Sequence, residues 1–347
     1  MSENTSIEWC DHTWTPVVGC DAISPACANC YAAIMAARLE AMGTEKYNGV
    51  AVRVGGKGKW TGKVNFSEAD LIKPLQVRRP GRWFLTSMGD VAHDAVTPEQ
   101  IVELFGVMAV AGAYGRFAMP RGHGGPHTFM VLTKRPKRLA MLLRLPTFRR
   151  MVGSAARRWA FNRVDMDWLA DGITGQNPLR RDAGFWPLPN VMIGCTAEDQ
   201  QRADELRPSM ASIAAAGWKT FVSYEPALGP VDWTGWEFLK QLISGGESGH
   251  KARPSHPDWH RAARDFSERN GIAYLFKQHG EWLATAFCTD EQAMLPHRGL
   301  AYISRDGAVH DGTAGVDFFG GDEEITRVGK KAAGRLLDGR TWDGVPA

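Results

Sequence analysis

Residues 191–199 read VMIGCTAED, and this stretch contains the pattern that decides the fold. Val191–Cys195 is a short apolar run, and the polar Thr196-Ala197-Glu198-Asp199 follows it directly. An apolar run of about four to eight residues is typical of a strand that is buried on both faces. We therefore predict a buried strand here, followed by polar residues at its C-terminal end.

The same kind of run recurs along the chain, separated by stretches with helical patterns. The other predicted strands are Thr13–Cys20, Trp83–Thr86, Phe129–Thr133, Thr220–Tyr224, Gln241–Ser244 and Ile272–Phe276. The predicted helices include Ala28–Met42, Pro98–Ala111, Asp199–Ala216 and Pro257–Asn270. Strands that alternate with helices indicate right-handed crossovers and a parallel sheet. The pattern predicts an α/β fold with a partial barrel, and a doubly wound open sheet is the alternative.

Polar residues follow the C-terminal ends of six predicted strands. They are Met88-Gly89-Asp90, Lys134-Arg135, Thr196–Asp199, Glu225-Pro226, Gly245-Gly246-Glu247-Ser248-Gly249 and Lys277-Gln278-His279. Active sites of parallel barrels are built at the C-terminal ends of the strands. We therefore expect an active-site face at this end of the sheet.

The chain divides into a barrel over residues 1–280 and a C-terminal part over residues 281–347. The connection at about residues 147–189 is unusually long, which suggests a lid, an insert or a partner surface. In the C-terminal part we predict a hairpin, Leu300–Ser304 with Ala308–His310, whose Asp306-Gly307 forms a type I′ turn. A basic helix is predicted over Val328–Asp338.

The composition excludes several classes of protein. The chain has 347 residues, 44% hydrophobic and 23% charged, with a net charge of +3. No stretch approaches the roughly 18 consecutive apolar residues of a membrane span, and the N-terminus does not resemble a signal peptide. Six cysteines are too few for a disulfide scaffold. We therefore expect reduced thiols and a cytoplasmic location.

A basic run extends from Lys134 to Arg163, with ten Lys and Arg residues and no Asp or Glu. Phe148, Trp159 and Phe161 lie among the charges. Such a run suits contact with a phosphate backbone and stacking on exposed bases. The alternative is an amphipathic helix whose leucines pack on the core.

Three of the six cysteines, Cys20, Cys27 and Cys30, lie within eleven residues between the first strand and the first helix. Three thiolates on one loop suit a soft metal centre, and a 4Fe–4S cluster bound by three protein ligands keeps one iron open. A structural zinc site usually has four protein ligands, and Cys10 or His12 would then be the fourth. A thiol cluster without metal is the third possibility.

Several sequence blocks resemble a phage and bacterial family that is defined by a three-cysteine motif and related to radical S-adenosylmethionine enzymes. The blocks are IEWCDHTWTPVVGCDAISPACANCYA from Ile7, LTKRP, VMIGCTAEDQ, EPALGP, ISGGESG, ARPSHPDW, LFKQHG and VGKKAAGRLLDGRTWD. Together they cover the chain from Ile7 to Asp343. Two features depart from the commonest radical-enzyme pattern: six residues instead of three separate Cys20 from Cys27, and Asn29 replaces the usual aromatic residue before Cys30.

The resemblance implies a radical-enzyme (βα)6-type partial barrel with a 4Fe–4S cluster on the three cysteines. The open iron would bind S-adenosyl-L-methionine, which on reduction gives a 5′-deoxyadenosyl radical. An external electron donor of the flavodoxin or ferredoxin type is the implied partner. The radical would need a dry cavity, which the connection at residues 147–189 would cap.

The expected site residues follow from the strand ends and the resemblance. Asp90, Glu247 and Lys277 are the catalytic candidates. The candidates for binding the cofactor are Gly89, Asp90, Glu198, Glu225, Gly245 and Gly246. Each has a structural alternative, because an acid can cap a helix and a glycine pair can form a turn.

We predict a radical enzyme that modifies a nucleobase, with pyrimidine hypermodification in phage DNA as the example. The nucleic-acid part rests on the basic run, the basic terminal helix and the phage association of the resembling family. Two alternatives remain open: a zinc-stabilised nucleic-acid-binding protein without catalysis, and a radical enzyme that acts on a peptide or a small metabolite.

Overall fold

The computed structural model describes residues 5, 7–77, 79–113, 127–160, 167–175, 185–293, 299–310, 312–317 and 319–346. The chain divides into two compact units. The first consists of Met1–Ile23, Cys30–Cys195 and Ser209–Thr220, and the second of Ser24–Asn29, Thr196–Pro208 and Phe221–Ala347. The predicted boundary at residues 280 and 281 lies inside the second unit.

The first unit contains four parallel strands in the order β1-β6-β7-β8. They are β1 (His12–Trp14), β6 (Arg82–Leu85), β7 (Thr128–Thr133) and β8 (Val191–Thr196). The helices that connect β6 to β7 and β7 to β8 are α3 (Pro98–Ala113), α4 (Pro136–Arg144), α5 (Pro146–Trp159) and α6 (Asp167–Thr174). All six residues of β8 are buried, as expected for a central strand of a parallel sheet.

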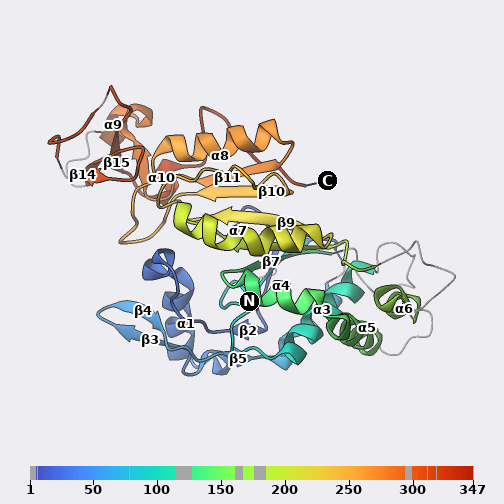
Figure 1. Ribbon diagram of the computed structural model, residues 1–347. Helices are drawn as coiled ribbons and strands as arrows, with labels where there is room; N and C mark the ends of the chain where they lie inside the picture. Colours follow the sequence, from blue (N-terminus) through green and yellow to red (C-terminus); the bar gives the residue numbers. More distant parts are fainter. Residues whose placement is uncertain are drawn as a thin grey trace. The chain divides into compact units, whose positions relative to one another are not determined.

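The second unit contains three parallel strands in the order β9-β10-β11. They are β9 (Lys219–Tyr224), β10 (Gln241–Gly245) and β11 (Ala273–Gln278). Helix α8 (Pro257–Arg269) connects β10 to β11 and packs on both strands (Figure 1). Helix α7 (Gln200–Ala215) connects β8 to β9.

The predicted alternation of strands and helices is confirmed: the protein is a mixed α/β protein with parallel strands, compatible with a partial TIM-like fold. One predicted strand, Thr13–Cys20, is wrong as a single element. It is divided into β1 and β2 (Val17–Val18), and β2 pairs antiparallel with β5 (Asn65–Phe66). Pro16 lies at the division, where proline lacks the N–H that a sheet ladder requires.

Helix α1 (Tyr31–Ala41) follows the last cysteine of the loop and packs on a two-stranded hairpin (Figure 1). The hairpin strands are β3 (Ala51–Val54) and β4 (Lys57–Trp60). Gly58 permits this packing, because a Cβ atom there would lie 2.4 Å from the backbone nitrogen of Ile34. The remaining short helices of the first unit are η2 (Glu45–Tyr47), η3 (Glu68–Asp70) and α2 (Lys73–Gln76).

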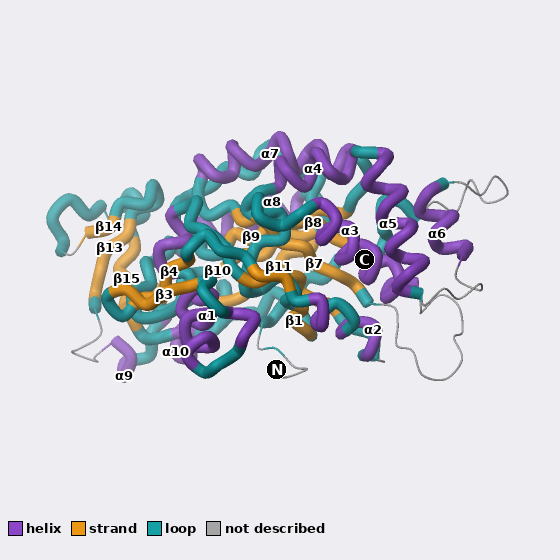
Figure 2. The backbone as a smooth tube through the Cα atoms, turned by 90° about the horizontal axis from the view of Figure 1, so that it is seen from below, coloured by secondary structure: helices purple, strands orange, loops and turns teal. Residues whose placement is uncertain are grey.

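The C-terminal part of the second unit contains an antiparallel sheet in the order β12-β15-β13-β14. Its strands are β12 (Trp282–Ala284), β13 (Leu300–Ile303), β14 (Val309–His310) and β15 (Glu323–Arg327). Strands β13, β14 and β15 are labelled in Figure 2. The short helices η6 (Thr285–Phe287) and α9 (Asp290–Ala293) follow β12.

Two details of the predicted C-terminal part are wrong, although β13 and β14 form the predicted hairpin. The turn is not of type I′, because only Gly307 has a positive φ (101°) and Asp306 does not. The predicted helix Val328–Asp338 is reduced to α10 (Lys330–Ala333). Gly329 and Gly334 flank it with φ values of 89° and 68°, which end the helix at both sides.

The described residues of the connection at 147–189 belong to α5, α6 and the segment before β8. Phe148 of α5 packs on Phe105 of α3, with ring centroids 5.7 Å apart, so this part of the connection packs beside α3 (Figure 1). Residues 161–166 and 176–184 lie outside the described residues. Within the described residues, no helix combines the length and the apolar character that crossing a membrane requires.

Candidate functional site

Cys20 lies in the first unit beside a network of charged side chains. Arg135 extends Nη1 to within 3.7 Å of the Cys20 sulfur and 2.9 Å of Asp90 Oδ2. The same guanidinium donates to Asp21, and His93 Nε2 lies 3.2 Å from Asp21 Oδ1. Burial raises the pKa of the Cys20 thiol to about 12, Asp90 adds to the rise, and Arg135 opposes it.

Two glycines bring the backbone before Cys20 against the end of β6. Gly19 and Gly89 form an isolated parallel bridge, and Gly19 donates its N–H to the Met88 carbonyl at 3.0 Å. A Cβ atom on Gly89 would lie 3.0 Å from the carbonyl oxygens of Gly19 and Val17. Gly89 is predicted to bind a cofactor. These close backbone contacts by themselves account for a glycine at this position.

Asp90 is a buried carboxylate whose oxygens are taken up by protein donors. It is 4% exposed and accepts hydrogen bonds from the Thr133 hydroxyl at 2.6 Å and the Lys134 N–H at 3.1 Å, in addition to Arg135. Its Oδ1 also accepts the N–H of Ala92 at 2.9 Å. Asp90 therefore orients Arg135 towards Cys20.

We call residues 20–30, which carry Cys20, Cys27 and Cys30, the cysteine loop. The middle of this loop belongs to the second unit. We call residues 24–29, which include η1 (Pro25–Asn29) and Cys27, the cysteine segment. The Ala26 N–H donates to Glu198 Oε1 at 3.3 Å, and Arg253 Nη1 donates to the Pro25 carbonyl at 3.0 Å. The Asn29 amide donates to Glu247 Oε2 at 3.1 Å and to the Lys251 carbonyl at 2.9 Å.

Glu247 forms a fork-like ion pair with Arg253. Arg253 donates Nε to Oε2 at 2.8 Å and Nη2 to Oε1 at 2.5 Å, and its backbone N–H also reaches Oε2 at 2.8 Å. Burial raises the pKa of Glu247, but the hydrogen bonds from Arg253 and Asn29 outweigh it and hold the pKa below its usual range. Glu247 is therefore ionised at neutral pH.

The two glycines before Glu247 lie against neighbouring backbone. A Cβ atom on Gly246 would lie 2.0 Å from the His279 carbonyl oxygen, so no other residue fits without a backbone shift. On Gly245 it would lie 3.2 Å from Glu225 Oε1. Gly245 is the last residue of β10, and the close backbone contact at Gly246 accounts for a glycine there.

Glu225 and Lys277 form a second charged pair at the strand ends of this unit. Lys277 Nζ lies 3.0 Å from Glu225 Oε1, and the Ser223 hydroxyl donates to Glu225 Oε2 at 3.2 Å. Both charged side chains keep partial exposure, 21% for Lys277 and 12% for Glu225. This pair is open enough to meet a polar ligand.

The three loop cysteines fit a soft metal centre by their chemistry. Each is partly exposed, none of the six cysteines forms a disulfide, and Cys30 is the N-cap of α1 with no side-chain capping bond. Metal binding releases the thiol protons, so cysteine thiols are compatible donors. In the described residues, no group of three or more His, Cys, Asp and Glu side chains is placed to hold a metal ion.

The proposed fourth zinc ligands lie at the other end of β6 from Cys20. His12 pairs with Trp83 at the start of β6, and their rings stack with centroids 4.4 Å apart. Cys10 is buried two residues earlier. Cys20 follows the bridge to Gly89, beyond the C-terminal end of β6. The geometry does not place His12 or Cys10 beside Cys20.

Most of the described arginines in the basic run are used inside the first unit. Arg135 pairs with Asp90 and Asp21, Arg138 donates to two backbone carbonyls, Arg149 donates to the Ile173 carbonyl, Arg157 pairs with Asp167, and Arg158 pairs with Glu103. Lys137, Arg144 and Arg150 are exposed on α4 and α5. We call these three residues the α4–α5 cationic face. Phe161 and Arg163 lie outside the described residues.

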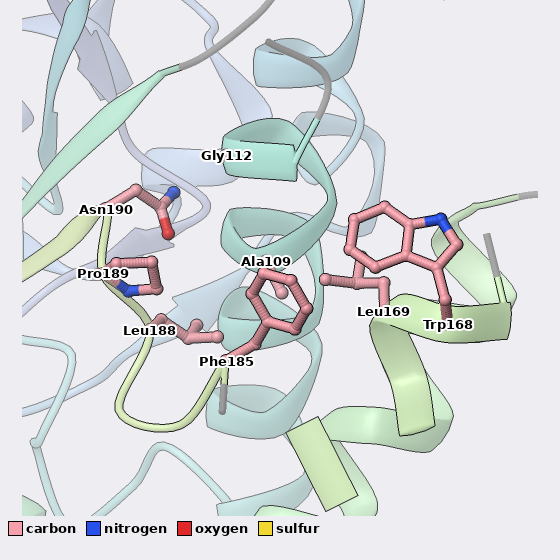
Figure 3. Close-up of a pocket in the computed structure, with 8 residues that line it drawn as sticks. All are labelled: Ala109, Gly112, Trp168, Leu169, Phe185, Leu188, Pro189 and Asn190. Carbon is pink, nitrogen blue, oxygen red and sulfur yellow. The ribbon is translucent and has the colours of Figure 1, made fainter. Parts of the chain in front are cut away.

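A cavity of about 30 Å³ lies between α3, α6 and the segment before β8 (Figure 3). Trp168, Phe185 and Leu188 give it apolar walls, and Asn190 is its polar lining residue. The Asn190 amide already donates to the carbonyls of Met108 and His127. This volume holds a water molecule and is too small for a nucleobase or a cofactor.

Arg253, Asn29 and His93 belong to these networks but are not among the predicted site residues. Arg253 lies six residues after Glu247. A basic residue this close in sequence to a buried acid at a strand end is the signal from which the ion pair could be predicted. Asn29 was noted only as a departure from a pattern. His93 follows Asp90 by three residues, and nothing in the sequence connects it to Asp21.

Comparison with known proteins identifies the family of the chain, and the description of that family names no function. Residues 4–346 match the family described as "Protein of unknown function (DUF5131)", so the chain belongs to this family. No curated protein and no solved structure matches the chain.

Proposed function

We propose that this DUF5131 protein is a radical S-adenosylmethionine enzyme whose 4Fe–4S cluster is held by Cys20, Cys27 and Cys30. One observation carries the proposal: in each unit, the cysteine loop is bonded to side chains that follow strand ends. In the first unit this is Arg135, which Asp90 holds, and in the second they are Glu198 and Glu247. A thiol-rich loop anchored at the C-terminal ends of parallel strands is where such a fold builds its active site.

When bound and reduced by the external donor, the cluster would supply the one electron that cleaves the S–C5′ bond of S-adenosylmethionine, which gives methionine and a 5′-deoxyadenosyl radical. The chain's own residues have separate tasks. Arg135 lies against the Cys20 sulfur and would stabilise its thiolate form. Lys277 and Glu225 remain partly exposed, and we assign them to polar groups of the cofactor or the substrate.

We further propose a nucleobase in a nucleic acid as the substrate. The α4–α5 cationic face supports this choice, because its three side chains are exposed and Met141 and Leu145 lie exposed among them. Cations follow a phosphate backbone, and apolar side chains add contact with exposed bases.

Anaerobic reconstitution tests the proposed function directly. Wild type should bind about four irons per chain with matching sulfide, and should release 5′-deoxyadenosine after reduction. Cys27→Ala should lose both properties. Cys288→Ala should keep them, because Cys288 lies outside the cysteine loop and packs beside Leu283.

Stoichiometric zinc without cofactor cleavage in the wild-type protein would contradict the proposal. It would favour the zinc-stabilised binding protein. Cleavage that proceeds with no altered nucleoside in DNA or RNA would leave the radical enzyme in place and would favour a peptide or a small metabolite as substrate.

A further inference from the structure

Two buried carboxylates at strand ends of the second unit are directed at the cysteine segment and not at open space. Glu198 is fully buried, and Glu247 is 6% exposed. Glu198 accepts a backbone N–H of the segment, and Glu247 accepts the Asn29 amide. Burying a carboxylate is costly unless it is paired, so these positions have a defined task.

Most of the hydrogen-bonding capacity of Glu247 is taken by the protein. Its two oxygens accept four hydrogen bonds, three from Arg253 and one from Asn29. Oε2 accepts three of them and Oε1 accepts one, and all the donors belong to the cysteine segment or to Arg253. Glu247 is therefore better assigned to the loop than to cofactor binding or catalysis.

Arg253 connects this carboxylate to the backbone on the other side of Cys27. Its Nη1 donates to the Pro25 carbonyl, while Nε and Nη2 hold Glu247. The cysteine segment is thus fixed two residues before and two residues after Cys27. A guanidinium suits this task, because its planar donors hold a carboxylate and a carbonyl at the same time.

We propose that Glu198, Glu247 and Arg253 are positioning residues that hold the cysteine segment in the conformation that receives the metal centre. The inference rests on the proposed function for the identity of that centre. The positioning itself is a property of the metal-free chain. In this proposal Glu247, the acid of the Gly245-Gly246-Glu247 stretch, positions the segment that contains Cys27.

Alkylation of the reduced, metal-free protein by iodoacetamide tests the positioning, with the rate at each cysteine followed by peptide mass spectrometry. Losing a hydrogen bond to a charged group corresponds to about a tenfold change in a local opening equilibrium. Asn29→Ala and Arg253→Gln should therefore accelerate alkylation of Cys27 about tenfold and leave Cys288 unchanged. Arg253→Lys should restore part of the protection.

Arg305→Gln is the matched control, because Arg305 pairs with Asp258 in the same unit at 2.7 Å and does not contact the cysteine segment. It should leave Cys27 at the wild-type rate. If Arg253→Gln accelerates the alkylation of Cys27 and Cys288 alike, the variant has lost its fold. The alkylation rate of Cys27 in Asn29→Ala then decides whether the segment is positioned. An unchanged Cys27 rate in Asn29→Ala would overturn the positioning role.

Iron retention separates this inference from the proposed function. If wild type retains iron and Asn29→Ala retains less of it, both are supported. If wild type retains no iron, the proposed function fails, and the alkylation rates still decide whether the three residues position the segment.

Discussion

His260 closes the turn that carries Glu247 and Arg253, and we expect its protonation to destabilise the second unit. Its ring is fully buried. Nδ1 lies 3.0 Å from the Ser244 hydroxyl at the end of β10, and Nε2 lies 3.0 Å from the Ser255 hydroxyl. A neutral imidazole has one donor and one acceptor nitrogen, and a hydroxyl can serve either. The ring therefore joins the two ends of the turn while it is neutral.

The size of the effect follows from the shifted pKa. Burial lowers the pKa of His260 to about 3, and His279, His256 and Arg261 act in the same direction. In the unfolded chain the imidazole titrates near 6.5. At pH 5 the unfolded chain binds a proton that the folded chain does not, which costs about 2 kcal/mol of stability. The loss begins as the pH falls through about 6.5 and is complete near pH 3.

Denaturant unfolding of wild type and His260→Gln at pH 7 and pH 5 measures this loss. Glutamine has a donor and an acceptor but does not titrate in this range. Between the two pH values, wild type should lose about 2 kcal/mol more stability than the variant, whatever the absolute stability of the variant. The histidines His256 and His279 are present in both proteins, so their contributions cancel. Equal losses would refute the assignment of a neutral His260.

Two further predictions concern the surface and the backbone. Replacing all three residues of the α4–α5 cationic face by Glu should weaken binding to single-stranded DNA and reduce the slope of log K against log salt by about 2. Arg158→Glu should instead lower stability and leave the slope unchanged, because Arg158 pairs with Glu103; a slope that responds equally to both changes would contradict this surface. Gly246→Ala should destabilise by about 1–3 kcal/mol because of the close His279 carbonyl. Gly312→Ala, where the Cβ atom meets nothing within 4 Å, should be nearly neutral in the same thermal or denaturant unfolding measurement.

The strands were predictable where apolar runs end at clear breaks. β8 is buried along its whole length, so its apolar character matches its environment residue by residue. Thr13–Cys20 was predicted as one strand, because an apolar run does not show which partner each part pairs with. β1 pairs with β6, whereas β2 pairs with β5. Both partner strands lie more than 40 residues away in sequence, so the local pattern does not show this change of partner.

The surroundings of the cysteine loop were predictable in part. Polar residues after strand ends indicated where charged side chains gather, and Asp90, Glu198 and Glu247 do contact the cysteine loop or the Arg135 beside it. Their partners could not be read from the sequence. Asn29 and Glu247 are 218 residues apart in the chain, and no local pattern connects them.

The same contacts account for both departures of the cysteine loop from the commonest radical-enzyme spacing. The residues between Cys20 and Cys27 include Asp21, which pairs with Arg135, and Pro25 and Ala26, whose backbones bond to Arg253 and Glu198. A gap of three residues would remove anchoring positions from this stretch. Asn29, in place of an aromatic residue, supplies the amide that Glu247 accepts. The longer gap and the asparagine are therefore parts of one arrangement, in which polar bonds hold the loop. For this reason, an aromatic residue at position 29 should loosen the loop, because it would remove the amide that Glu247 accepts.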